Sequence, residues 1–285
     1  MREQKAVFEK LTPEGQGPHA ADDVAALSAE SPHYEAAVDK AADPVTHRVR
    51  VITYNIRKGK GASGRAKIPM ESLGEALSGH KADVVLCQEV FHSKHGGNDE
   101  QTRHLAQSLG FHSYYGANKF RAIGHHGNST FSRLRAEHFK NHDISTNRIE
   151  RRGALYVRLS LGDMPLHVIN VHLGLNKWQR AAQGRFIVKL IDEMCSEGEP
   201  VLLAGDFNDW QRALDRWFVE ELGFANALAG CVPEQLATWP TQRPTLCLDR
   251  IYTRNLRAVS ATRLDGARWR GLSDHLPLLA DLQIG

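Results

Sequence analysis

The stretch VLLAGDFND (201–209) decides the fold class. Its apolar run from Val201 to Ala204 is typical of a buried strand, and a glycine followed by polar residues ends that run. Side chains alternate along a strand, so Asp206 and Asn208 share one face while Phe207 points to the opposite face, towards a core. The segment therefore predicts a buried strand that carries polar side chains at its end.

Six further segments repeat this pattern of an apolar run with polar residues at or near one end. They are RVRVITYNI (48–56), ADVVLCQEV (82–90), GALYVRLSL (153–161), PLHVINVHL (165–173), LDRIYTR (248–254) and HLPLLADLQI (275–284). Helical patterns lie between some of them, at 68–80, 98–110, 178–194 and 213–222. No repeat and no Pro/Gly-rich linker follows residue 48. The pattern predicts one α+β domain over residues 48–285.

Composition and charge narrow the function classes. Of the 285 residues, 41% are hydrophobic and 24% are charged, as in a soluble globular protein. Residues 1–48 contain nine acidic and five basic residues, and residues 49–285 contain 24 acidic and 31 basic ones. Residues 1–47 are therefore expected to be an acidic tail, disordered or partly helical. The moderately basic remainder suits an anionic substrate, but it lacks the strong basic stripe of a dedicated nucleic-acid binder.

Three sequence features that are not found determine the expected cellular location of the protein and the redox state of its cysteines. No run approaches the roughly 20 apolar residues that a membrane span needs, so no stable membrane insertion is expected. The N-terminus MREQKAVFEK lacks the apolar stretch of a secretory signal, which favours a cytoplasmic location. The four cysteines show neither a CxxC pair nor zinc-ligand spacing, so we expect reduced thiols.

Polar residues at the strand ends are the candidates for chemistry. They are Asn55, Glu89, His172, Asp206 and Asn208 at the ends of strands, Asp249 at the start of one, and Asp274 with His275 in a turn. Side chains that a rigid sheet brings to one edge are well placed to form a site. Carboxylate and amide oxygens suit a hard cation, which is held by one or two carboxylates and by phosphate oxygens of the substrate.

These residue types predict a metal site for a phosphate ester. Glu89 is the expected first ligand of Mg²⁺ (or Mn²⁺), with Asn55 and Asp274 helping directly or through water. A bound cation would neutralise phosphoryl oxygens during an in-line displacement.

The remaining residues predict the acid–base chemistry. Asp206 is expected to orient or deprotonate the attacking water. A carboxylate behind a histidine fixes its tautomer and stabilises the imidazolium, which is the role expected of Asp249 behind His275. Asn208 and His172 are uncharged donors that could hold the phosphoryl group.

Each fragment by itself has an ordinary structural explanation. Glu89 could be a solvated strand end, Gly-Asp-Phe-Asn a turn, and Ser-Asp-His a capping element. Zinc is a rival use of histidine and aspartate, but no HExxH or paired short spacing supports it. The joint pattern favours the phosphoester site.

The ordered series of fragments resembles the endonuclease/exonuclease/phosphatase superfamily. The fragments are TYNI (53–56), QEV (88–90), GNSTFSR (127–133), NVHL (170–173), GDFND (205–209), LDRIY (248–252) and SDHLPL (273–278). A narrower resemblance to one group of bacterial members rests on GHHGN (124–128) and RRGALY (151–156), among other segments.

The resemblance implies a DNase I-like fold, a four-layer α/β/β/α sandwich of two mixed β-sheets with the site at one rim. It also implies attack of water on a phosphate ester with magnesium or manganese. By motif position it assigns Glu89 to the metal, Asp206 and Asn208 to water and phosphate, and Asp249 with His275 to the carboxylate–histidine pair. Members of the superfamily differ on whether the aspartate or the histidine is the base.

Two departures from the family pattern concern His172. Abasic-site endonucleases of this superfamily usually carry Tyr at this position and Asn three positions later, where this chain has Leu175. His172 instead resembles the nuclease, sphingomyelinase and inositol-phosphate branches, which makes a DNA-repair role less favoured. No acidic residue is evident behind His172, and Asn128 or the His125–His126 loop could stand near it. Asn128 is placed, together with Asn55, among the substrate-binding residues.

The loop RKGKGASGRAK (57–67) has five basic residues and directly follows Asn55. It is either a solvated loop or a clasp for an anionic substrate, in which Lys58 and Lys60 would bind the substrate.

Three functions remain open. The first is a phosphodiesterase acting on nucleic acid or a phospholipid headgroup, and the second is a phosphomonoesterase on a small soluble phosphate ester such as an inositol phosphate. The third is a catalytically inactive binding protein on the same fold, which the intact set of polar residues disfavours.

Overall fold

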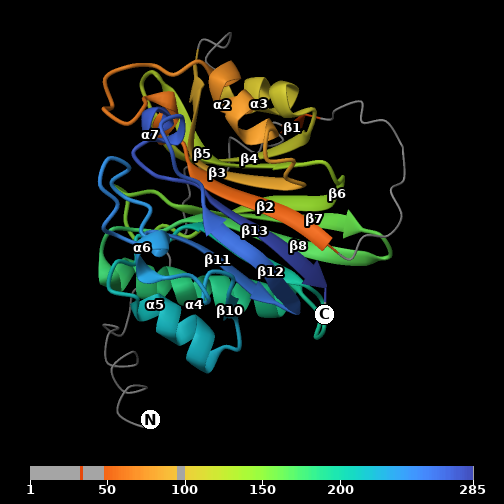
Figure 1. Cartoon of the computed structure of the whole chain (residues 1–285). Helices are drawn as coiled ribbons and strands as arrows, with labels where there is room; N and C mark the ends of the chain where they lie inside the picture. Colours follow the sequence, from red (N-terminus) through yellow and green to blue (C-terminus); the bar gives the residue numbers. More distant parts are fainter. Residues whose placement is uncertain (1–32, 35–47, 95–99, 285) are drawn as a thin grey trace.

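Two β-sheets packed face to face form the centre of the molecule, and helices cover both outer faces (Figure 1). This computed structural model describes residues 33–34, 48–94 and 100–284. In spatial order the first sheet contains β1 (His33–Tyr34), β4 (His112–Arg121), β5 (Gly124–Ser132), β3 (Val84–Ser93), β2 (Arg48–Asn55), β13 (Leu278–Ile284) and β12 (Leu256–Arg263). The second contains β10 (Ala225–Asn226), β11 (Asp249–Arg254), β9 (Val201–Asp206), β8 (Met164–His172), β7 (Gly153–Leu161) and β6 (Ala136–Asp143).

Each sheet is mixed and contains one parallel pair. β2 runs parallel to β3, and β8 runs parallel to β9, while the other pairs are antiparallel. Three of these strands, β2, β8 and β9, end in Asn55, His172 and Asp206. Glu89 of β3 comes directly after Gln88, the register partner of Asn55, so the parallel pairs bring all four residues to the same rim.

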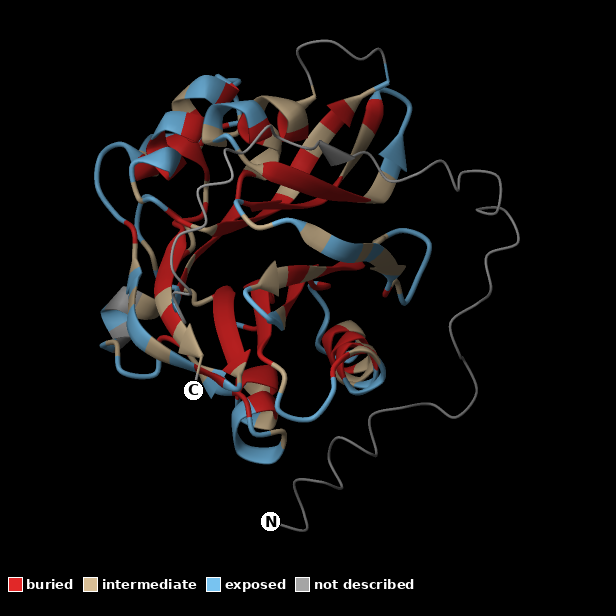
Figure 2. Cartoon of the chain, turned by 90° about the vertical axis from the view of Figure 1, so that its right-hand side faces the viewer, coloured by how far each residue is buried: buried red, intermediate tan, exposed pale blue. Residues whose placement is uncertain are grey.

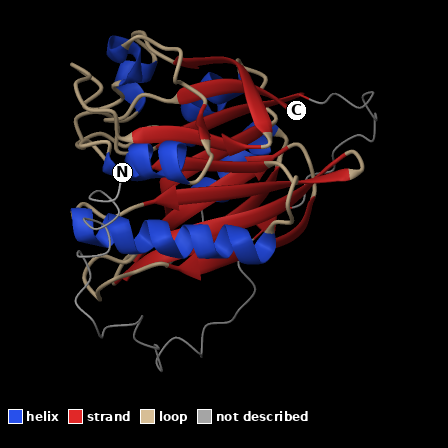
Figure 3. Cartoon of the chain, turned by 90° about the horizontal axis from the view of Figure 1, so that it is seen from below, coloured by secondary structure: helices blue, strands red, loops and turns tan. Residues whose placement is uncertain are grey.

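The helices complete four layers. They are α2 (Met70–Ser78), α3 (Gln101–Leu109), α4 (Lys177–Met194), α5 (Ala213–Arg216), α6 (Pro233–Leu236) and α7 (Trp269–Leu272), with a 3₁₀ turn at Arg57–Gly59 and a π-helical turn at Trp217–Glu221. The pair α2 and α3 covers the first sheet, and α4 with α5 covers the second (Figure 1). Seen from below, α4 runs along its sheet as one long helix (Figure 3). The expected α/β/β/α sandwich is confirmed.

Strand alternation distributes the core over three layers. Ile52 and Tyr54 of β2 pack under α2 and α3, whereas Val49 and Val51 lie between the sheets. Ile169 and Val171 of β8 face α4. The buried residues accordingly follow the strands through the centre of the molecule (Figure 2). Asn55 and His172 therefore belong to the faces that meet between the sheets, at the rim.

Most expected elements are confirmed, and several strands escaped prediction. The four helical patterns correspond to α2, α3, α4 and the segment from α5 into the following turn. The strands β4, β5, β6 and β12 were not recognised as strands from the sequence. β6 and β12 are half-exposed along most of their length, so they lack the apolar runs that identified the others.

Only two residues of the expected acidic tail are described. His33 and Tyr34 form β1, which pairs with Tyr114 and Ser113 of β4. The expectation that residues 1–47 are disordered or partly helical otherwise lies outside the described residues. Among the helices that are described, none is long and apolar enough to cross a membrane. The four cysteines are unpaired, as expected, and the cytoplasmic location remains a prediction.

Candidate active site

Neighbouring strands of the second sheet place three candidate residues in one row. His172 at the end of β8 is the register partner of Asp206 at the end of β9, and Asp206 is the register partner of Asp249 at the start of β11. All three side chains are buried. The next residue, Phe207, is fully buried against Tyr252 with ring centroids 5.1 Å apart, which confirms its predicted direction into the core.

One carboxylate oxygen of Asp206 is the meeting point of the two sheets. The Nδ2 of Asn55 donates to Asp206 Oδ2 over 3.0 Å. The Nε2 atoms of His172 and His275 lie 3.5 and 3.7 Å from the same oxygen. The other oxygen, Oδ1, accepts the backbone N–H of Asn208 at 3.0 Å. Residues from four distant segments of the sequence therefore converge on one carboxylate.

His275 is held from behind by Asp249. Its Nδ1 lies 2.8 Å from Asp249 Oδ2, and that same oxygen accepts the hydroxyl of Thr238 at 2.5 Å. This arrangement leaves Nε2 of His275 directed at Asp206. The structure thus forms the carboxylate–histidine pair that the sequence predicted, and adds Thr238 as a support that no motif indicated.

The charges of this cluster determine its protonation. Burial lowers the pKa of His275, but the carboxylates of Asp249 and Asp206 outweigh it and raise that pKa to about 10. Burial raises the pKa of Asp206 to about 6, against the opposing charge of His275. Burial, followed by the charges of Arg152 and His275, keeps the pKa of His172 well below its ordinary value. Near neutral pH the site therefore contains an imidazolium, a carboxylate and a neutral imidazole.

Glu89 lies in a β-bulge of β3. The register with β5 shifts between Cys87 and Val90, so two residues of β3 oppose one residue of β5, and Glu89 has φ of +55°. Bulges near active sites redirect side chains in this way. Burial raises the pKa of Glu89, but the ammonium of Lys58, which hydrogen-bonds to Glu89 Oε2, together with the charges of His126 and His275, outweighs burial and lowers that pKa.

The expected metal ligands offer oxygen atoms at the same rim. Asn55 Oδ1 accepts the backbone N–H of Arg57 at 3.0 Å, and Asp274 forms an ion pair with Arg57 at 3.2 Å. A carboxylate from Glu89, an amide oxygen from Asn55 and a carboxylate from Asp274 are the hard donors that magnesium or manganese prefers. The Lys58 ammonium against Glu89 also indicates that this position accepts a cation. The residues fit a divalent cation.

A second grouping could hold a metal by distance alone. Ligand atoms of Asp206, Asp249 and His275 all lie within 4.8 Å of one another. However, the Oδ2 of Asp249 and the Nδ1 of His275 are hydrogen-bonded to each other. One oxygen of Asp249 and one nitrogen of His275 are therefore already engaged with each other.

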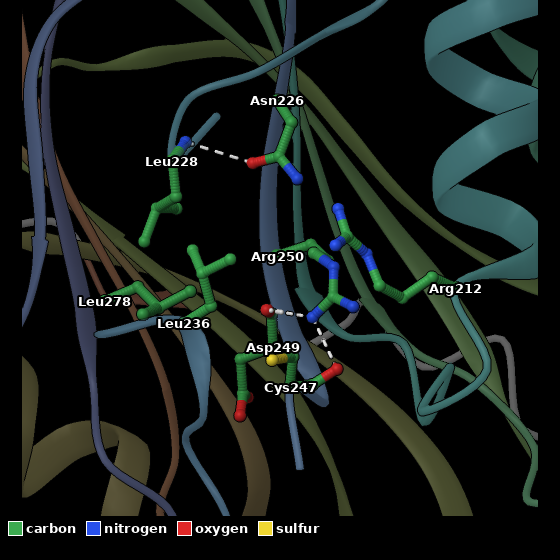
Figure 4. A pocket seen from close by; sticks show the side chains of 8 residues that line it. All are labelled: Arg212, Asn226, Leu228, Leu236, Cys247, Asp249, Arg250 and Leu278. Carbon is green, nitrogen blue, oxygen red and sulfur yellow. Dashed lines mark hydrogen bonds between the residues drawn. The ribbon is translucent and has the colours of Figure 1, made fainter. Parts of the chain in front are cut away.

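A small cavity lies behind Asp249. Its volume is about 10 Å³, and the side chains around it come from Arg212, Asn226, Leu228, Leu236, Cys247, Asp249, Arg250 and Leu278 (Figure 4). Arg250 donates to the backbone carbonyls of Cys247 and Asp249, which secures the start of β11 (Figure 4). Such a volume holds roughly one water molecule. The cavity is therefore too small to hold a phosphate ester.

The other predicted residues occupy varied positions. The Nδ2 of Asn208 donates to Leu173 O at 3.0 Å, which joins the ends of β8 and β9. The Nδ2 of Asn128 donates to the carbonyls of Gly153 and Asn170, at 3.0 and 3.1 Å. Lys60 is exposed. The nearest acidic group to His172 that the structure identifies is Asp206 itself.

Several residues near the site were not singled out from the sequence. Arg57 pairs with Asp274, and Ser273 donates to the Asn55 carbonyl at 2.6 Å. Arg152 Nε donates to Leu173 O at 3.0 Å, beside His172. Arg152 occurs in RRGALY, a segment behind the narrower resemblance, and this was the signal that could have indicated it. His126, by contrast, belongs to the His125–His126 loop that the sequence indicated as a possible neighbour of His172, and its charge helps to lower the pKa of Glu89.

Comparison with known proteins agrees with this geometry. The model of the Endonuclease/Exonuclease/phosphatase family matches residues 52–275. The chain belongs to this family. Members of the family are generally phosphoesterase hydrolases and typically use divalent metals, so the chain is a phosphoester hydrolase at the level of its family.

Within this family, the narrower resemblance is also confirmed. YbhP of Escherichia coli strain K12 is 38% identical over 245 residues, which cover 82% of this chain and 96% of YbhP. A UPF0294 protein of Vibrio cholerae is 28% identical over 143 residues, 47% of this chain and 46% of that protein.

Solved structures of the family share the fold. An endonuclease/exonuclease/phosphatase from Beutenbergia cavernae superposes with a TM-score of 0.70 at 18% identity, over 84% of this chain and 72% of that one. TDP2 from Caenorhabditis elegans superposes with a TM-score of 0.64 at 20% identity, over 84% of this chain and 75% of that one.

Proposed function

We propose that this protein is a divalent-metal-dependent phosphodiesterase in which a water molecule, activated by Asp206, attacks phosphorus in line with the leaving group. The observation that carries the proposal is the convergence of Asn55, His172 and His275 on Asp206 Oδ2, within 3.0 to 3.7 Å. A buried carboxylate surrounded by donors, at a rim that also contains Glu89, suits the activation and orientation of water.

The pKa shifts favour Asp206 over His275 as the general base. With its pKa raised to about 10, His275 is already protonated at neutral pH and has no free lone pair on Nε2. Its imidazolium can donate to a phosphoryl oxygen as charge develops in the transition state. Asp206, with a pKa of about 6, is mostly ionised at neutral pH and can accept the proton of the water.

His172 and Asn208 complete the acid–base side of the site. Because burial and the neighbouring cations keep His172 neutral, it can donate one hydrogen bond to the phosphoryl group without adding charge. Asn208 fixes Asp206 through its backbone N–H. Its side chain joins the ends of the two parallel strands, so we assign it a positioning role beside any contact with phosphate.

The cation would be held by Glu89, with Asn55 and Asp274 contributing oxygen atoms directly or through water. A bound Mg²⁺ or Mn²⁺ supplies neutralisation of the phosphoryl oxygens. Lys58 lies against Glu89 and must yield part of that contact when a cation is present. It is then free to bind an anionic substrate, as Lys60 is from its exposed position.

Asn128 fits substrate binding less well. Its amide nitrogen is engaged by two backbone carbonyls, and its Oδ1 is buried without a hydrogen-bond partner among the described residues. Only its Oδ1 remains available. This atom is a hydrogen-bond acceptor, as is an ionised phosphate oxygen, so the two cannot hydrogen-bond to each other.

A substrate panel with the purified chain tests the proposed function. It contains bis-p-nitrophenyl phosphate, p-nitrophenyl phosphate, single-stranded DNA, RNA and phospholipid, each with magnesium, manganese or EDTA. We expect hydrolysis of the diester, and none in EDTA. Preference for the monoester would favour a phosphomonoesterase acting on a small soluble phosphate, and full activity in EDTA would contradict metal dependence.

Substitutions then test the assigned roles. Glu89→Ala and Asp206→Asn should each lower turnover by at least ~100-fold, the usual scale for losing a general base or comparable electrostatic support. The control is Glu197→Ala, because Glu197 is exposed and lies in the turn after α4. Parental turnover in either site variant would refute the role assigned to that residue.

A further inference from the structure

Six exposed apolar side chains occur on the loops beside the active site and at the neighbouring ends of β4 and α4. They are Phe120, Ile123, Ile149, Leu175, Trp178 and Trp210, which are 58, 69, 84, 58, 43 and 43% exposed. We call this set the apolar rim. Single exposed apolar residues are ordinary on a protein surface, whereas a group of them beside a site indicates an interaction surface.

Hydrogen bonds and a cation–π contact join one half of the apolar rim. The backbone N–H of Leu175 donates to Glu150 at 3.3 Å, which places Leu175 beside the loop that contains Ile149. Arg180 donates to the Leu175 carbonyl at 2.6 Å and lies 4.7 Å from the ring centre of Trp210. Ile149, Leu175 and Trp210 therefore occur on three adjoining loops.

The other half comes from the hairpin between β4 and β5, which contains Phe120 and Ile123. Asn118 of this hairpin accepts a hydrogen bond from Asn141 of β6 at 3.0 Å, so the hairpin lies against the strand that leads into the Ile149 loop. Lys119 and His126 are register partners across the hairpin.

The apolar rim adjoins the candidate active site. Arg152 ends the Ile149 loop, and its Nε donates to the carbonyl of Leu173, the residue after His172. Leu173 in turn donates its backbone N–H to Asp206 O at 2.8 Å. A surface bound at the apolar rim would therefore lie next to the catalytic cluster.

The loops that carry Phe120, Ile123 and Ile149 are basic. Residues 117–126 contain two basic residues and no acidic one, and residues 144–152 contain three basic residues and one acidic one. Lys177 lies 5.2 Å from the ring centre of Trp178. The basic loop 57–67 follows Asn55 of the same site. Apolar side chains interspersed with cations match the surface of a bilayer that contains anionic lipid.

The chemistry of the most exposed residues favours a lipid bilayer over nucleic acid as the partner. Single-stranded nucleic acid is bound by aromatic rings on which bases stack. The most exposed members of the apolar rim, Ile149 and Ile123, are aliphatic and offer no ring. Aliphatic side chains gain free energy by entering the acyl region of a bilayer.

We propose that the apolar rim docks this protein onto an anionic phospholipid bilayer, so that the phosphate ester it hydrolyses is a phospholipid headgroup. The choice of substrate rests on the proposed function, whereas the docking itself does not.

Vesicle binding by the Asp206→Asn chain tests the docking without hydrolysis. The probes are vesicles of phosphatidylcholine with and without phosphatidylglycerol, and bound protein is measured by sedimentation. We expect binding to the vesicles that contain phosphatidylglycerol and weak binding to the others. The double variant Ile149→Ser/Leu175→Ser should reduce the binding constant by at least tenfold, on the order expected for withdrawing two apolar side chains from the bilayer.

The control is Met164→Ser, because Met164 is 39% exposed at the start of β8, the end of that strand opposite to His172. It should bind like the parent, and each variant should retain the circular dichroism spectrum and thermal midpoint of the parent. Equal loss in the control, or no binding to either vesicle, would overturn the docking. If the protein binds the vesicles but the parent hydrolyses no phosphate ester in the substrate panel, the proposed function is overturned and the docking stands.

Two further measurements distinguish other occupants. Single-stranded oligonucleotide should neither bind with higher affinity than the vesicles nor lose binding in the Ile149→Ser/Leu175→Ser variant. The same variant should leave the oligomeric state in gel filtration unchanged. Tighter binding of the oligonucleotide than of the vesicles, or its loss in the variant, would assign the apolar rim to nucleic acid. A change in oligomeric state would assign it to a second copy of the chain. Either result would contradict docking to a bilayer.

Discussion

At the scale of single residues, Asp206 and His275 show how burial creates function. Water would screen the interaction between their charges, but both side chains are buried. The hydrogen bond from His275 to Asp249 keeps the imidazole protonated. The same contacts that raise the pKa of His275 also contribute to the stability of the fold, because a pKa difference between the folded and unfolded states is a free-energy difference.

Asp249→Asn should therefore destabilise the protein in a pH-dependent way. The pKa of His275 is raised from 6.5 to about 10 by its carboxylate neighbours. This stabilisation is fully present below pH 6.5 and is lost as the pH rises through about 10. We expect Asp249→Asn to lower the free energy of unfolding by about 3 kcal/mol at pH 6, the scale for breaking a buried ion pair.

Urea denaturation at pH 6 and pH 10 measures this effect, and the difference between parent and variant should shrink at the higher pH. A pH-independent difference would show that the imidazolium does not contribute. Asp163→Asn is the control, since Asp163 is an exposed aspartate in the turn between β7 and β8.

The basic loop after β2 offers a second prediction at this scale. Replacing Lys58 or Lys60 with alanine should raise KM for an anionic substrate by about five- to tenfold while turnover stays near the parental value, because ground-state and transition-state binding weaken equally. Lys140→Ala, an exposed lysine of β6, should leave KM unchanged. Steady-state kinetics distinguish the two outcomes, and a fall in turnover alone would count against the clasp.

At the scale of elements, the parallel pair β8 and β9 positions His172 and Asp206 of the candidate site. Gly205 comes just before Asp206 and has φ of +144°. An added Cβ there would lie 2.0 Å from the backbone oxygen of Val171. Only glycine permits this close approach of the two strands, so the position of Asp206 depends on it.

Gly205→Ala should lower the free energy of unfolding by at least about 3 kcal/mol, because the backbone of β8 has to move and the residue is strained at this φ. Gly198→Ala is the matched control, since Gly198 also has positive φ, +87°, but an added Cβ there meets nothing within 4 Å. It should cost about 1 kcal/mol or less. Equal losses in urea denaturation would indicate that conformational strain, and not the contact with Val171, dominates.

At the scale of the whole molecule, a polar network ties the two sheets together next to the site. Asn170 of β8 donates to the Ser129 carbonyl at 2.9 Å and accepts from Gln88 at 2.8 Å. Asn128 of the first sheet donates to the Asn170 carbonyl. These bonds cross an otherwise apolar interface, and they align the rim where Asn55 meets Asp206.

Asn170→Ala should therefore destabilise the molecule as a unit. It would remove the partners of several buried polar atoms, each of which costs about 1–3 kcal/mol when left unsatisfied. We expect a loss of at least about 2 kcal/mol in urea denaturation. Ser160→Ala removes only an exposed hydrogen bond to Glu137 and should change stability by less than about 0.5 kcal/mol. Parental stability of Asn170→Ala would show that the network is dispensable.

The strand ends could be predicted because each signal is local. The apolar run before Asp206 and the alternation that buries Phe207 both occur within ten residues, so the sequence alone indicates a strand and the face on which its polar residues lie. Half-exposed strands such as β6 lack this contrast, and for that reason they were missed.

The amino-acid order thus indicated which polar side chains are candidates for chemistry, while folding specified how they meet. No local pattern indicates the bulge that redirects Glu89, the hydroxyl of Thr238 on Asp249, or the raised pKa of His275. Those properties arise between segments far apart in the chain, where burial removes water and places charges within a few ångströms of each other. The same holds for the apolar rim, since only folding decides which apolar side chains are buried and which stay exposed together.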